Sequence, residues 1–259
     1  MIPLRKLFIL TVQLVSGLYR LFDHPTEIQN YFEKNNITNG QILLNSRGEI
    51  IGSIGSLPDE MVRKRSADRR SAANQMLRAI SFRGSETIID WVHDFEIKQS
   101  DYYIGKVLSG FLLEYQAVRS QIEQHLKLCQ SDAKYIITGH SLGAALAVLC
   151  AVHIYIEFGI QPTVYLYASP RVGNIEFANW YDQHIPNTYM FYLAGDIAPN
   201  FPSVNMGCYK HVAYPHYILN YDPAKAGCSL HTYHSMDNFL LTDEWFKHTR
   251  RRGLHPYGL

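Results

Sequence analysis

Apolar residues along this chain follow two spacings, a helical period and short strand-like runs. Helical spacing extends to about residue 33, and the Arg47-Gly48 turn between 42–44 and 50–51 predicts a β-hairpin. Polar residues predict a turn at 35–40 and a loop at 55–74. Further on, the pattern predicts strands at 77–82, 135–137, 164–167 and 189–193, and helices at 107–128, 144–156 and 175–181. Such alternation is typical of an α/β fold with a mostly parallel sheet and helices on both faces.

The most informative stretch joins the strand at 135–137 to the helix that follows it. It contains Gly139, Ser141 and Gly143 in a Gly-x-Ser-x-Gly motif with a strand–turn–helix setting. This is the setting of a nucleophile elbow, where glycines permit a sharp turn and the serine hydroxyl projects from the carboxyl edge of the sheet. The helix N-terminus behind the serine also favours developing negative charge. We expect Ser141 to be a nucleophile; the alternative is a buried turn without chemistry.

Length and charge limit the classes of function. The chain has 259 residues, a formal net charge of +1, 47% apolar residues and 18% charged residues. These values fit one domain, residues 1–259, with a sizeable core, and they show no excess of charge that would favour a nucleic-acid partner. Basic clusters at 63–70 and 250–252 are interpreted as solvated loop and tail, with an anionic interface as the alternative.

The N-terminal segment, residues 1–22, has two interpretations. Arg5 and Lys6 precede an apolar run at 7–15, followed by small residues at 15–17, as in a secretory signal segment. The same residues also form an amphipathic helix pattern, and the run is too short to span a bilayer. The sequence does not decide between secretion, a membrane surface and the cytoplasm.

A serine nucleophile needs a base and a carboxylate that orients it. In α/β-hydrolases these follow the serine in the order Asp or Glu, then His. Asp196 follows the apolar run at 190–193 by a short turn and is the candidate carboxylate, with Asp222 as the competitor. Six histidines keep the order: His211, His216, His231, His234, His248 and His255. His234 opens a segment whose apolar residues could anchor a short helix, and is preferred over its rival His231.

The histidine next to the nucleophile receives a different interpretation. His140 is expected to point to the opposite side of the elbow and to be structural.

Ester hydrolysis also needs hydrogen-bond donors for an oxyanion. The backbone N–H of Leu142 is one candidate, because it follows the nucleophile. The second is expected from the end of the strand at 77–82, where Gly84 permits a close turn and Ser85 offers an N–H and a hydroxyl. Arg83 is expected to pair with a carboxylate such as Asp94.

The cysteines allow a competing hypothesis. Cys208-x2-His211 and Cys228-x2-His231 have the spacing of zinc ligands. The simpler interpretation is a Cys208–Cys228 disulfide or two free thiols beside structural histidines. Cys150 lies in the helix after the elbow and is expected to be a buried thiol.

Several motifs together resemble the class 3 lipases, the fungal triacylglycerol-lipase-like branch of the α/β-hydrolases. The matching segments, within residues 75–241, are 82–85, 90–94, 109–111, 139–146, 168–174, 196–199 and 234–236. The Ser-Pro-Arg-Val-Gly-Asn run at 169–174 is distinctive. The resemblance implies Ser141 as nucleophile, Asp196 as orienting carboxylate and His234 as base. It also implies Ser85 and Leu142 as oxyanion donors.

The resemblance has further consequences and some departures. The segment 87–95, with Trp91, resembles a mobile lid of the family, and its alternative is an ordinary packed helix. Leu108 stands where the family usually has histidine, and Ala144 replaces a common glycine. The basic segment 57–73 resembles an insertion without a family role.

The expected function is hydrolysis of lipid esters such as acylglycerols by a Ser-His-Asp mechanism, with no cofactor and no metal. The expected substrate lies at a membrane or lipid-droplet interface, with neither nucleic acid nor an obligatory protein partner indicated. Phospholipase A1 or feruloyl-type esterase activity is the enzymatic alternative, because the shape of the acyl pocket cannot be obtained from one sequence. A non-catalytic scaffold that kept the lipase fold is the remote alternative.

Overall fold

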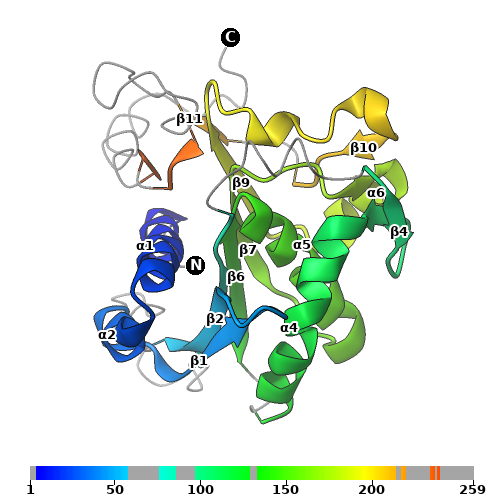
Figure 1. Ribbon diagram of the computed structural model, residues 1–259. Helices are drawn as coiled ribbons and strands as arrows, with labels where there is room; N and C mark the ends of the chain where they lie inside the picture. The colour runs from blue at the N-terminus through cyan, green and yellow to red at the C-terminus, as the bar shows by residue number, and fades with distance from the viewer. Residues whose placement is uncertain are drawn as a thin grey trace, which may run out of the picture.

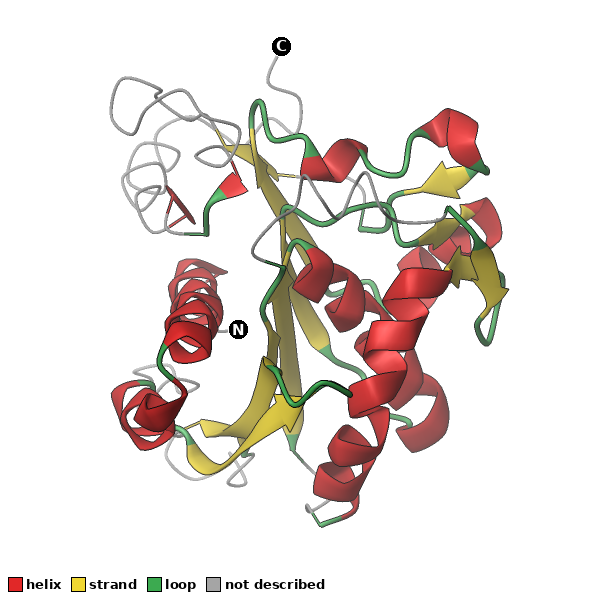
Figure 2. Ribbon diagram, viewed as in Figure 1, coloured by secondary structure: helices red, strands yellow, loops and turns green. Residues whose placement is uncertain are grey.

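The computed structural model describes residues 4–57, 76–85, 97–128, 133–213, 217–219, 234–236 and 238–239. A seven-stranded sheet forms its centre (Figures 1 and 2), in the order β1-β2-β3-β6-β7-β9-β11. The strands are β1 (Thr38–Leu44), β2 (Ile50–Leu57), β3 (Leu77–Phe82), β6 (Lys134–His140), β7 (Thr163–Tyr167), β9 (Thr188–Leu193) and β11 (Tyr217–Leu219). The pairs from β3 to β11 are parallel, and the β1–β2 hairpin adds two antiparallel pairs at one edge. The predicted mostly parallel sheet is confirmed.

Helices cover both faces of this sheet (Figure 1). On one face lie α1 (Leu4–Asp23), a short 3-10 turn at Pro25–Glu27 and α2 (Ile28–Lys34). On the other lie α4 (Ser109–Lys127), α5 (Leu142–Phe158) and α6 (Ile175–His184). In the described residues, no helix is long and apolar enough to cross a membrane.

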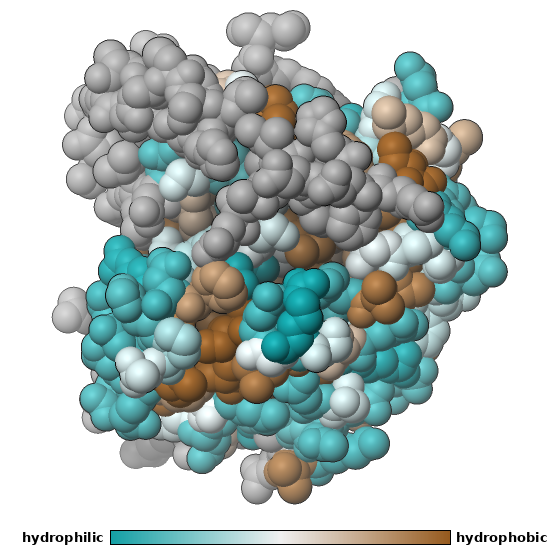
Figure 3. Space-filling model, viewed as in Figure 1, coloured by the Kyte–Doolittle hydropathy of each residue, from teal (hydrophilic) through white to brown (hydrophobic). Residues whose placement is uncertain are grey.

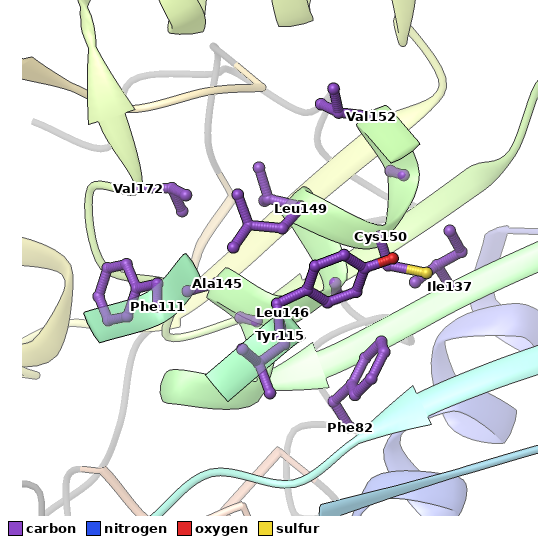
Figure 4. Close-up of a cluster of buried hydrophobic side chains, with 14 of the residues drawn as sticks. Phe82, Phe111, Tyr115, Ile137, Ala145, Leu146, Leu149, Cys150, Val152 and Val172 are labelled. Carbon is purple, nitrogen blue, oxygen red and sulfur yellow. The ribbon is translucent and has the colours of Figure 1, made fainter. Parts of the chain in front are cut away.

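The alternation of side chains along each strand divides the core into two clusters. Ile136 faces the cluster around α1, and its neighbour Ile137 faces the cluster around α5, because successive strand side chains point to opposite faces. Figure 4 shows the α5 cluster, in which Tyr115 of α4 directs its hydroxyl toward the sulfur of Cys150. The Cys150 thiol is buried and free, as the sequence predicts, and burial raises its pKa to about 12.

A second, smaller sheet was not predicted. It consists of β10 (Tyr209–Lys210), β8 (Gly173–Asn174), β5 (Lys106–Leu108) and β4 (Gln99–Asp101), in that order. The expectation that the helix begins at residue 107 is therefore wrong. Leu108 is extended, with φ −61° and ψ 124°, and the helix starts at Ser109.

Other boundaries differ by a few residues. Strand β1 begins at Thr38, so the expected turn at 35–40 ends earlier, and β2 continues through Leu57 into the segment expected to be a loop. Thr38 of β1 pairs with Ser56 of β2. The two strands are therefore longer than the short apolar runs from which the hairpin is predicted.

The described surface is mainly polar on the face seen in Figure 3, with an apolar patch over the β1–β2 hairpin. Large apolar side chains are also exposed singly elsewhere, including Leu113 of α4 at 69%. The basic segment at 63–70, the predicted lid at 87–95 and the basic residues 250–252 lie outside the described residues.

Candidate active site

Ser141 occupies the turn between β6 and α5 in a strained conformation. Its φ is 57° and its ψ is −125°, a combination that a residue with a Cβ rarely adopts. Its backbone N–H donates to Tyr167 O of the adjacent strand at 2.9 Å, and its carbonyl accepts from Ala144 N at 3.0 Å. Bonds to the neighbouring strand and to the first turn of α5 thus hold the residue in place. This is the geometry expected of a nucleophile elbow.

The two motif glycines are required by close contacts around the elbow. A Cβ on Gly139 would collide with the carbonyl of Gly143. A Cβ on Gly143 would lie 2.6 Å from Phe82 O and 2.5 Å from Arg83 O. Helix α5 therefore packs directly on the ends of β6 and β3, which brings the segment after β3 next to Ser141.

Asp196 follows β9 in a tight turn. Gly195 has φ 96°, a value that favours glycine, and Asp196 N donates to Leu193 O at 3.1 Å. The Asp196 side chain is fully buried, and its Oδ1 accepts from Ala198 N at 2.9 Å. The carboxylate therefore has a fixed direction.

His234 contacts the Asp196 carboxylate. Its Nδ1 lies 3.0 Å from Asp196 Oδ1 and 3.0 Å from Oδ2, although the two residues are 38 positions apart in sequence. The rivals Asp222 and His231 lie outside the described residues, as do His216, His248 and His255. His211 is described and has a different contact, since its Nε2 lies 2.6 Å from Pro199 O.

The other nitrogen of His234 is not engaged. His234 Nε2 is buried and has no hydrogen-bond partner within the described part of the chain, so no hydrogen bond joins it to the Ser141 hydroxyl in this structure. The structure thus brings Asp196 and His234 into contact and leaves the serine–imidazole link unformed. Such links often tighten only when substrate is bound.

His140 does not point away from the site, so that expectation is wrong. Its ring lies 4.5 Å from the His234 ring between centroids, tilted by 34°. The end of β6 places His140 on the α1 side of the sheet, where Tyr19 of α1 contacts its Nδ1 at 2.8 Å. Sequence reasoning missed Tyr19, because no local motif marks a residue 121 positions from its partner.

The two expected oxyanion donors share one pocket. Ser85 and Leu142 both line a cavity of about 180 Å³, together with Gly84 and Leu146. Asn45, Arg47, Glu49 and Glu114 add polar and charged lining. The two residues therefore lie on the same small space beside the elbow.

Arg83 supports the segment that carries Ser85. Its Nε donates to Ile50 O at 2.6 Å and its guanidinium donates to Gly84 O at 2.9 Å. The guanidinium also lies over the Phe22 ring at 3.6 Å. The expected partner Asp94 lies outside the described residues.

A metal centre finds no support in the residues that the structure describes. Within them, no group of three or more His, Cys, Asp and Glu side chains is arranged to hold a metal ion. Cys208 is exposed and its thiol is free. Cys208 therefore forms no disulfide in this structure, in line with the free-thiol interpretation. The second half of the alternative zinc set, Cys228 and His231, lies outside the described residues.

Comparisons with known proteins identify a family and several relatives that this chain resembles. The family model described as lipase (class 3) matches residues 79–206. A secreted mono- and diacylglycerol lipase of Fusarium solani is 33% identical over 150 residues, which cover 56% of this chain and 44% of that relative. A secreted mono- and diacylglycerol lipase A of Penicillium cyclopium is 31% identical over 158 residues, 58% of this chain and 50% of the relative. The chain thus spans half or less of the length of these relatives.

A solved structure shows the same fold. A triacylglycerol lipase with a serine-protease triad as its catalytic centre aligns over 90% of this chain and 91% of its own, with a TM-score of 0.65 and 22% identity. That likeness establishes the α/β-hydrolase fold. The family model covers most of β3, the elbow and the Asp196 turn, so this part of the chain, residues 79–206, belongs to the class 3 lipase family.

Proposed function

We propose that this chain hydrolyses carboxylic esters of lipids through an acyl-enzyme on Ser141. The observation that carries the proposal is the contact of His234 Nδ1 with both Asp196 oxygens. The His234 ring also lies 4.5 Å from the ring of His140, which directly precedes Ser141 in its strained elbow conformation. A buried carboxylate on Nδ1 fixes the imidazole tautomer that leaves Nε2 free to accept a proton. The unpartnered Nε2 of His234 is suited to this role.

The proposed reaction has two halves. His234 takes the proton from the Ser141 hydroxyl as the hydroxyl oxygen attacks the ester carbonyl, and returns it to the departing alcohol. Water, deprotonated by the same imidazole, then releases the carboxylic acid. Asp196 stabilises the imidazolium in both halves, and the N–H groups of Ser85 and Leu142 stabilise the oxyanion. These steps use only groups of the chain and water.

The proposed substrates are acylglycerols, because the two relatives carry the names of mono- and diacylglycerol lipases. We further propose that the chain acts at the surface of its lipid substrate, and that it does so outside the cell, since both relatives are named as secreted. We also propose that residues 1–259 form one domain, because α1 supplies core residues on one face of the central sheet.

Hydrolysis of defined esters tests the proposal. Wild type should release fatty acid from mono-, di- or triacylglycerol emulsions, and Ser141→Ala should lose nearly all of this activity. Ser46→Ala, in the exposed hairpin turn, is the matched control and should retain it. Release from phospholipid vesicles or feruloyl esters instead of acylglycerols would move the substrate to those classes. Equal activity of Ser141→Ala and wild type would refute the mechanism.

A further inference from the structure

One hydroxyl of the N-terminal helix joins two segments of the candidate site. The Gly84 N–H, next to the proposed oxyanion donor Ser85, donates to the Tyr19 hydroxyl oxygen at 2.9 Å. The same oxygen lies 2.8 Å from Nδ1 of His140, the residue before the nucleophile. Tyr19 thus contacts both the Gly84-Ser85 segment, here called the oxyanion segment, and the elbow.

The packing around Gly84 is tight on both sides of this contact. A Cβ on Gly84 would lie 2.6 Å from the Tyr19 hydroxyl, 2.8 Å from the Ser141 Cβ and 2.8 Å from His140 O. The Gly84 backbone is therefore held between Tyr19 and the nucleophile. A shift of Tyr19 would move the oxyanion segment relative to Ser141.

His140 extends the contact to the base. Its buried ring packs against the His234 ring, with 4.5 Å between centroids. The Phe239 ring also contacts His140 edge-on, with 6.2 Å between centroids. Contacts therefore connect Tyr19 of α1 with His140, and His140 with His234.

We propose that Tyr19 and His140 are positioning residues that hold the oxyanion segment, the elbow and the base in one fixed arrangement. This inference rests on the proposed ester hydrolase function. The Tyr19 oxygen accepts from Gly84, and its own proton is directed to His140 Nδ1. His140 then presents a neutral ring to His234, and the orientation of that ring limits the tilt of the base.

The charge of His140 matters for the same reason. Burial, followed by the neighbouring His234, lowers the pKa of His140 well below its usual range, so the ring is neutral at neutral pH. His234 becomes a cation as the serine proton is transferred. A second cation at this separation would oppose that step, because like charges repel strongly in a low-dielectric site.

Comparison of two tyrosine variants tests the inference. Tyr19→Phe removes the hydroxyl and keeps the ring. It should lower kcat for a soluble ester by about 10- to 100-fold, because misplacement of catalytic groups acts on the chemical step. KM should change by less than about twofold. Tyr31→Phe is the matched control. Its buried hydroxyl lies 2.9 Å from Ser53 Oγ of β2. Like Tyr19, Tyr31 thus links an N-terminal helix to the rest of the fold through its hydroxyl, but its contact is with β2 and not with the site. Its kcat should equal that of wild type.

Variants of His140 test the contact between Tyr19 and His140 from the other side, and they are informative even if Tyr19→Phe does not fold. Asparagine can present an acceptor near the position of Nδ1, and leucine cannot. His140→Asn should therefore keep several times more kcat than His140→Leu. Tyr19→Phe should also cost less in the His140→Leu background than in wild type, because residues that act through one another are non-additive.

The outcomes separate this inference from the proposed function. Equal kcat for Tyr19→Phe and Tyr31→Phe, or equal kcat for His140→Asn and His140→Leu, would overturn the positioning role while wild type remains an active esterase. If wild type hydrolyses no ester, the proposed function fails, and this inference fails with it.

Discussion

His234 Nδ1 lies at the same distance, 3.0 Å, from both oxygens of Asp196. The carboxylate is itself fixed by Ala198 N, so the imidazole receives its direction from the turn after β9. The other imidazole nitrogen remains without a partner in the described residues, and in the proposed mechanism it accepts the serine proton. The relationship links two segments that only the fold brings together.

Replacement of Asp196 by asparagine tests how much the contact between Asp196 and His234 contributes to catalysis. Asp196→Asn should lower kcat by about 10³- to 10⁴-fold, because the amide cannot stabilise the imidazolium and favours the wrong tautomer. Steady-state kinetics on a soluble ester measure the effect. Asp101→Asn is the control, since Asp101 is 87% exposed and pairs with Lys106 on the small sheet. An Asp196→Asn enzyme with wild-type kcat would remove Asp196 from the mechanism.

The elbow glycine Gly143 should be intolerant of a methyl group. Gly143→Ala places a Cβ against the carbonyls of Phe82 and Arg83, and should cost about 1–3 kcal/mol of unfolding free energy through overpacking. It should also lower activity by at least about tenfold, because the Leu142 N–H moves with the backbone.

Gly48→Ala provides the comparison for Gly143. Gly48 has φ 76° and open space around its Cβ position, so alanine there costs about 1 kcal/mol of backbone strain and leaves kcat unchanged. Urea denaturation and ester kinetics on both variants check the pair. Full activity of Gly143→Ala would show that the tight packing of the elbow is not needed.

Asn174 should contribute to stability as a helix cap. Its Oδ1 accepts from Phe177 N at 2.9 Å at the start of α6, and lies 3.2 Å from Lys106 N of β5. Asn174→Ala should lower the unfolding free energy by about 1 kcal/mol or somewhat more, because a cap and a loop contact are lost together. The exposed Asn187→Ala is the control in urea denaturation. Equal stability of the two variants would contradict this role.

Buried His153 should make stability depend on pH. Its Nδ1 lies 2.6 Å from the Tyr115 hydroxyl, and its Nε2 lies 3.3 Å from Glu123 Oε1. Burial, with a smaller contribution from Arg119, lowers the pKa of His153 to about 4. In the unfolded chain the pKa is about 6.5. The unfolded state therefore binds the proton first as pH falls, and stability is lost between about pH 6.5 and 4.

Urea denaturation at pH 7 and pH 4.5 measures this dependence. His153 should account for about 2 kcal/mol of the loss in wild type, and His153→Asn should lose correspondingly less. The exposed His24→Asn variant should behave as wild type. Arg119, whose hydrogen bond is the largest cause of the lowered pKa of Glu123, is present in all three proteins. The same loss in His153→Asn and wild type would show that His153 does not titrate with unfolding.

Local patterns were enough to predict the elbow and the main elements. The strand at 77–82, the Ser141 turn and the order of Ser, Asp and His each depend on neighbours in sequence, and the fold confirms the strand and the turn. The distinctive run at 169–174 contributes the β8 strand and the α6 cap.

Contacts between distant segments could not be predicted in this way. The small sheet pairs Val107 with Gly173, and neither residue belongs to a long apolar run. His140 was misjudged because its neighbours in space, Tyr19 and His234, lie on the N-terminal helix and near the other end of the chain. A side chain at the end of a strand can point to either face, and packing decides which groups it meets.

Labelling with a fluorophosphonate, followed by peptide mapping, tests the central claim most directly, because the reagent reacts only with a serine that a base has activated. The account predicts stoichiometric label on Ser141 in wild type, no label in Ser141→Ala and strongly slowed labelling in His234→Ala. Label on a different residue, or an unlabelled wild-type protein that is folded, would contradict it.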